Sequence, residues 1–93
     1  MLDTEVKIEV KVGRVTDFYA VPVVAAVELA CPLAVGDIIR IKGPKTDMEL
    51  AVTSMQINNR DVDSAVTGDS VGIKVPEQVR RGDIVYGVIE RLF

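Results

Sequence analysis

The chain has 93 residues, a formal net charge of −3 at pH 7, no histidine and one cysteine. Hydrophobic residues make up 48% of the chain and aromatic residues only 4%. This length predicts one domain at residues 1–93, with a core of aliphatic side chains. The acidic balance argues against holding nucleic acid by bulk electrostatics, and the lack of histidine argues against a zinc site and against Ser–His or Cys–His catalysis.

Six strands are predicted along the chain, and the first, at residues 4–13, has the clearest alternation. Valine or isoleucine alternates there with glutamate or lysine, which predicts one wet face. The second strand, at residues 23–29, is apolar on both faces, as expected for a strand covered on both sides. Phe18 and Tyr19 precede it, and they either cap the core or form a stacking platform for a nucleotide base.

The later strands are marked by a repeated turn dipeptide. It occurs as Gly36-Asp37 before residues 38–42, Gly68-Asp69 before residues 71–75, and Gly82-Asp83 before residues 84–89. Glycine permits turn conformations and aspartate accepts hydrogen bonds from turn amides, so the same turn is predicted three times.

The remaining elements complete an all-β prediction. Residues 48–57 form a strand that is bulged near Ser54, and residues 76–82 form one helical turn. Without an amphipathic helix to cover them, these short apolar strands favour a closed six-stranded antiparallel barrel, because closure removes sheet edges.

Several classes of function are not expected. No secretory signal and no apolar run of about 20 residues is present, which predicts a cytoplasmic protein with no membrane partner. No P-loop occurs. We expect no metal ion, no cofactor and no catalytic residue, so the chain is not expected to be an enzyme. A small enzyme that uses the turn carboxylates stays as a third alternative.

Three segments together resemble the second domain of the translational GTPases, and most nearly the factor that delivers aminoacyl-tRNA in archaea and eukaryotes. They read V-x-S-M-Q-I-N-N, A-x-x-G-D-S-V-G-I and R-R-G-D-I-V. The resemblance implies a Greek-key barrel that binds rather than catalyses, because the GTPase domain is absent. In the family this barrel helps to hold the terminal adenosine of tRNA. Two acidic positions of that pocket correspond to Glu28 and Gln56, and two histidines correspond to Asn58 and Asn59.

Two functions follow as hypotheses. The first is a non-catalytic module that binds RNA, such as tRNA or rRNA on the ribosome, or a ribonucleoprotein. The predicted binding residues are Glu28, Arg40, Lys42, Lys45, Gln56, Asn58, Asn59 and Lys74. The alternative is a protein-interaction barrel that serves as a subunit of a larger enzyme or factor, or that self-associates. It is motivated by the apolar strands, which offer more apolar surface than one small barrel can bury.

Overall fold

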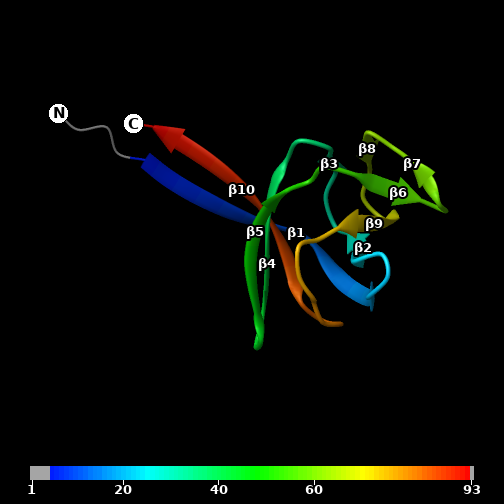
Figure 1. Cartoon of the computed structure of the whole chain (residues 1–93). Coiled ribbons are helices and arrows are strands. Elements are labelled where there is room, and N and C mark those ends of the chain that lie inside the picture. Colours follow the sequence, from blue (N-terminus) through cyan, green and yellow to red (C-terminus); the bar gives the residue numbers. More distant parts are fainter. Residues whose placement is uncertain (1–4, 93) are drawn as a thin grey trace.

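The computed structural model describes residues 5–92, and it consists of strands, turns and loops, with no helix in that range. The strands are β1 (Glu5–Tyr19), β2 (Val24–Leu29), β3 (Leu33–Ala34), β4 (Ile38–Gly43), β5 (Thr46–Ala51), β6 (Met55–Ile57), β7 (Arg60–Asp61), β8 (Ser64–Ala65), β9 (Ser70–Lys74) and β10 (Ile84–Leu92). Figure 1 shows their arrangement. The all-β prediction is confirmed.

The main sheet has eight strands in the order β5-β4-β10-β1-β2-β9-β6-β7, and β3 pairs with β8 in a second sheet. The predicted closed barrel is not found, because the main sheet ends at β5 on one side and at β7 on the other. Residues 52–54, which connect β5 to β6, are not in a strand, so β5 does not continue into β6. The count of six strands is not confirmed either, since the single strand predicted at residues 48–57 is divided there.

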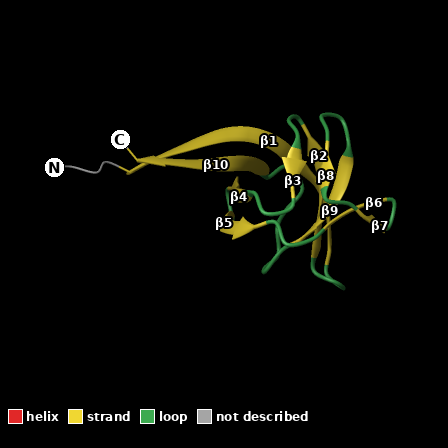
Figure 2. Cartoon of the chain, turned by 90° about the horizontal axis from the view of Figure 1, so that it is seen from above, coloured by secondary structure: helices red, strands yellow, loops and turns green. Residues whose placement is uncertain are grey.

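Strands β1 and β10 pair along a long antiparallel ladder from Glu5↔Leu92 to Arg14↔Ile84. Their outer halves project from the other strands as a two-stranded ribbon (Figures 1 and 2). We call residues 5–10 and 87–92 the arm. The prediction of a charged, wet face for β1 holds there, but the apolar face is also open to solvent. Residue 4, where the first predicted strand begins, lies outside the described residues.

The core lies where the inner half of β1 packs with β2, β4, β9 and β10. Its largest fully buried side chains, each 0 to 2% exposed, are Val15, Val27, Ile39, Ile41, Val52, Met55, Val71, Ile73, Val79 and Val85. A register shift between Lys11 and Gly13 bends β1 as it enters this core. The core is therefore aliphatic, as the composition predicts, and the arm lies outside it.

The three Gly-Asp turns are confirmed, and they share one geometry. The glycines Gly36, Gly68 and Gly82 have φ values of 99°, 93° and 93°. In each turn the aspartate carboxylate accepts a hydrogen bond from the backbone N–H three residues earlier, at 2.9 Å for Asp37, 2.9 Å for Asp69 and 2.8 Å for Asp83. Each turn leads into a strand, namely β4, β9 or β10.

The helical turn predicted at residues 76–82 is wrong. The described backbone there is irregular and ends in the third Gly-Asp turn. The Arg80 N–H donates to the Asp83 carboxylate, and the Arg80 carbonyl accepts a bond from the Asp83 N–H at 3.0 Å. The N–H and C=O groups of Arg80 thus both bond to Asp83 within the turn, and they do not take part in helical hydrogen bonds.

Candidate functional site

Arg40, one of the predicted binding residues, lies among carboxylates. Its Nε is 2.9 Å from Asp47 Oδ1 on the neighbouring strand β5 and 3.9 Å from Glu9 Oε2 on the arm. Its Nη1 is 3.7 Å from Glu49 Oε1. The hydrogen bond from Arg40 lowers the pKa of the Asp47 carboxyl group, and the positive charge of Arg40 adds to this effect. The Arg40–Asp47 pair is exposed, so its contribution to stability is small. This contribution is fully present above the pKa of an aspartate in the unfolded chain, and it is lost as the pH falls through the lowered pKa of Asp47 in the folded protein.

Lys42 joins the same cluster from the next outward-facing position of β4. Its Nζ lies 2.8 Å from Glu9 Oε1 and 5.6 Å from the centre of the Tyr86 ring. Lys7 adds a further contact, 3.8 Å from Glu49. This face of the arm and β4 therefore has charges of both signs that pair with one another.

The other predicted charged residues are not gathered with Arg40 and Lys42. Lys45 lies in the exposed turn between β4 and β5. Lys74 ends β9 opposite Val24, and β10, β1 and β2 separate β9 from β4 in the sheet. Glu28 is exposed on β2, opposite Ser70. The structure thus does not bring the predicted cations onto one basic face.

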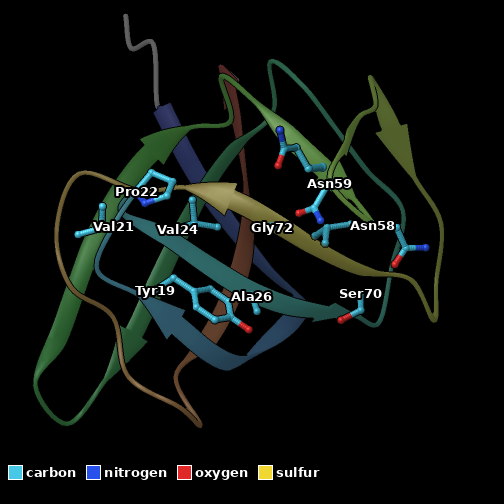
Figure 3. A pocket seen from close by; sticks show the side chains of 11 residues that line it. Tyr19, Val21, Pro22, Val24, Ala26, Asn58, Asn59, Ser70 and Gly72 are labelled. Carbon is cyan, nitrogen blue, oxygen red and sulfur yellow. The ribbon is translucent and has the colours of Figure 1, made fainter.

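Three predicted residues, Gln56, Asn58 and Asn59, do come together at an open pocket of about 490 Å³. The other lining residues are Tyr19, Val21, Pro22, Val24, Ala26, Ser70, Val71 and Gly72. Figure 3 shows Val21 and Pro22 on one side, Asn58 and Asn59 on the other, and Val24, Ala26 and Gly72 between them. Most of these residues were not assigned to a site from the sequence. Positions 24, 26, 70 and 72 alternate with buried positions on their strands, and this alternation was the available sign that they share an outer face.

Asn58 and Asn59 have a clear local role in this pocket. They form the two-residue loop between β6 and β7, and their φ values are 51° and 64°. A two-residue hairpin loop of this type needs positive φ at both positions, which asparagine tolerates better than other non-glycine residues. The amide of Gln56 donates to Asp61 Oδ1 at 2.9 Å across the same hairpin. The hairpin thereby forms a stable polar rim.

A second pocket, of about 320 Å³, lies where the arm meets the turn before β4. Its lining residues include Val10, Pro32, Ile38, Val88 and Ile89. Ile8 lies directly opposite Ile89 in the ladder, so these two side chains share one face of the arm. We call Ile8, Val10, Ile38 and Ile89 the arm patch.

The arm patch exposes four large aliphatic side chains together. The exposed fractions are 40% for Ile8, 45% for Val10, 39% for Ile38 and 47% for Ile89. Single exposed hydrophobic residues are ordinary, but a group such as this one, in which Val10, Ile38 and Ile89 line the same pocket, is typical of an interaction surface. Sequence reasoning assigned this face of β1 to the core, because alternation alone does not show that no other strand covers the arm.

Residues 5–92 offer neither a metal site nor a membrane-spanning helix. No group of three or more carboxylate or cysteine side chains there could hold a metal ion. No helix in the same range is long and apolar enough to span a bilayer.

Comparisons with known proteins connect the chain to peptidases. No protein-family model matches the chain. A Methanocaldococcus jannaschii protein named as an uncharacterized protease is 46% identical over 79 residues, which cover 84% of this chain and 19% of that protein. The chain therefore spans about a fifth of the length of this relative.

Solved structures share the fold of this chain. The C-terminal domain of a Geobacillus thermoleovorans protein assigned to the U32 peptidases superposes with a TM-score of 0.78 and 16% identity, covering 83% of this chain and 90% of that domain. The selenomethionine variant of the same domain gives a TM-score of 0.78 over 82% of this chain and 96% of that one. This chain has the fold of that domain.

These findings correct three predictions. The assignment to the second domain of translational GTPases is wrong, because the relatives are named as peptidases. The RNA-binding module that followed from it is overturned with it. The prediction that the chain is not an enzyme is overturned too, because a relative with 46% identity is named a protease. Two of the three segments that carried the resemblance contain Gly68-Asp69 and Gly82-Asp83. These dipeptides form turns here, and turns of this kind are common in β-rich domains of many functions.

Proposed function

We propose that the chain works as one protein-interaction domain of a peptidase, and that it binds the larger remainder of that peptidase through the arm patch. The observation that carries this proposal is the joint exposure of Ile8, Val10 and Ile89 on the arm and of Ile38 on β4, since Val10, Ile38 and Ile89 line one pocket. The relative supports it, since the matched 79 residues there accompany a remainder about four times as long.

The arm patch has enough apolar surface to matter for binding. Full burial of a large aliphatic side chain is worth roughly 1.5–3 kcal/mol, and each of the four is still about two-fifths exposed. Covering them together would contribute roughly 2–5 kcal/mol before the costs of association. Charged neighbours of the patch pair with one another, as Lys42 does with Glu9, so the apolar side chains supply the proposed contact.

The proposal predicts what accompanies the chain in its native cells. A tagged copy of the chain should be recovered together with a peptidase-related polypeptide, either joined to it or bound to it, and mass spectrometry of the eluate would identify that polypeptide. The same eluate should hydrolyse a fluorescent casein substrate faster than an eluate from untagged cells. Recovery of the chain with no peptidase-related sequence would contradict the proposal.

A further inference from the structure

The 490 Å³ pocket opens where the β6–β7 hairpin separates from β9. Strand β6 pairs with β9 at Met55↔Ile73 and Gln56↔Gly72, and then ends at Ile57. Residues 69 and 75 bond on the β2 side, through Leu29 N–H to the Asp69 carbonyl and Val75 N–H to the Val23 carbonyl, so by alternation the backbone groups of Val71 also point to β2. The backbone groups of Ser70 point to the β6 side, where no described strand pairs with them. Unpaired backbone groups at the edge of a strand can bond the backbone of an extended peptide.

The floor of the pocket allows a backbone to approach closely. Ala26 and Gly72 lie opposite each other on β2 and β9, and both line the pocket, as Figure 3 shows. Neither residue has a side chain longer than a methyl group. A strand position without a long side chain often marks a place where another backbone comes close.

One wall of the pocket is apolar, and the other has polar but uncharged side chains. Tyr19, which is 53% exposed, and Val21, which is 91% exposed, belong to the apolar side together with Pro22. Asn58 and Asn59 supply amide groups on the other side, and each amide can both donate and accept hydrogen bonds. None of the lining residues is charged.

We propose that this pocket binds an extended, uncharged peptide segment of a few residues. The unpaired backbone groups of Ser70 would bond the peptide backbone, the side chains of Tyr19 and Val21 would contact its apolar side chains, and the amides of Asn58 and Asn59 would bond its remaining polar groups. The pocket volume lies within the range of about 300–1,000 Å³ that is usual for ligand sites. A polyanionic ligand fits less well, because phosphate groups are bound mainly by lysine and arginine, and the lining has neither.

This inference goes beyond the proposed docking of the chain on a peptidase. No residue lines both pockets, so the peptide site and the arm patch are separate surfaces. A peptide site beside a peptidase would hold a polypeptide substrate, but the binding itself needs only this chain. The test is therefore made on the 93-residue chain alone, and its result does not depend on the peptidase.

The test is an NMR titration of the isotope-labelled chain with three probes. The first is a capped hexapeptide of alternating valine and threonine, the second a hexapeptide in which glutamate replaces each threonine, and the third a six-nucleotide adenylate RNA. We expect the neutral peptide to bind with a dissociation constant below about 1 mM, to shift the amide signal of Ser70, and to bind at least tenfold more tightly than either charged probe.

Variants separate the pocket from the rest of the surface. Tyr19→Ala and Gly72→Ala should each weaken binding of the neutral peptide at least fivefold, since one removes an apolar wall and the other raises the floor. Val66→Ala is the matched control, because Val66 is 62% exposed and lines neither pocket, and it should bind as the unchanged chain does. Unchanged spectra in the absence of ligand would show that each variant is folded. The proposal is overturned if the neutral peptide does not bind, if the RNA binds more tightly, or if both pocket variants bind as the control does.

Discussion

Replacing Gly13 with alanine is expected to lower the free energy of unfolding by about 3 kcal/mol, because β1 and β2 approach closely at this position. A β-carbon there would lie 2.5 Å from the carbonyl oxygen of Glu28 and 2.9 Å from a methyl group of Val27. The oxygen belongs to the backbone of a paired strand, so it cannot move aside without breaking ladder contacts. Such overpacking commonly costs about 1–3 kcal/mol, and contact with a rigid backbone places Gly13 at the upper end.

Gly72→Ala is the matched control for Gly13→Ala. Its added β-carbon would meet only a methyl group of Val24, at 3.3 Å, and that side chain is half-buried and able to shift. We expect this variant to lose less than about 1 kcal/mol. Urea denaturation followed by circular dichroism would give both values. Equal losses in the two variants would show that the close contact at the β1 bulge does not matter for stability.

Replacing Asp83 with alanine is expected to cost about 2–3 kcal/mol. The Asp83 residue is only 2% exposed, and its carboxylate accepts the Arg80 N–H at 2.8 Å. Gly43 faces the same carboxylate, and any β-carbon at position 43 would overlap it. Removal of the carboxylate takes away a charge-assisted hydrogen bond, leaves the Arg80 N–H without this partner and opens a cavity next to Gly43.

Asp37→Ala provides the comparison for Asp83→Ala, because the two aspartates make the same turn bond. The Asp37 carboxylate accepts the Ala34 N–H at 2.9 Å, but Asp37 is exposed, so water can replace the lost partner. We expect Asp37→Ala to cost less than about 1 kcal/mol. Thermal unfolding measured by calorimetry would rank the two variants. A larger loss for Asp37→Ala would contradict the account in which burial of the turn, rather than its geometry alone, sets its contribution.

The features of the fold that depend on near neighbours in the sequence were predictable. The Gly-Asp turns need only a glycine that tolerates positive φ and a carboxylate that reaches an amide three residues away, as at Gly68 and Asp69. The alternation of apolar and charged residues along β1 likewise depends only on neighbouring positions in the sequence. The failure of the sheet to close was not predictable in this way, because it depends on how β5 and β6 lie relative to each other after the break at residues 52–54.

The candidate sites depend on contacts that are remote in sequence. Lys42 is paired with Glu9, 33 residues away, so counting cations along β4 could not reveal that their charges are balanced. Ile8 and Val10 have the sequence pattern of a core face, and only the projection of the arm beyond the other strands (Figure 1) shows them to be exposed. The resemblance to translation factors failed for a related reason, since turn residues such as Gly82 and Asp83 report a local geometry rather than a function.

The most direct test of the proposed docking is a photo-cross-link from the arm patch. A photoreactive residue would replace Ile89, which is 47% exposed in the patch, and in a matched protein it would replace Val66, which is 62% exposed elsewhere. After illumination in native cells, we expect position 89 to cross-link to peptidase-related sequence outside these 93 residues, at a yield at least about tenfold above that from position 66. This readout works whether the two parts are one polypeptide or two. Equal yields from both positions, or no peptidase-related product from position 89, would contradict the proposal that the arm patch binds a peptidase.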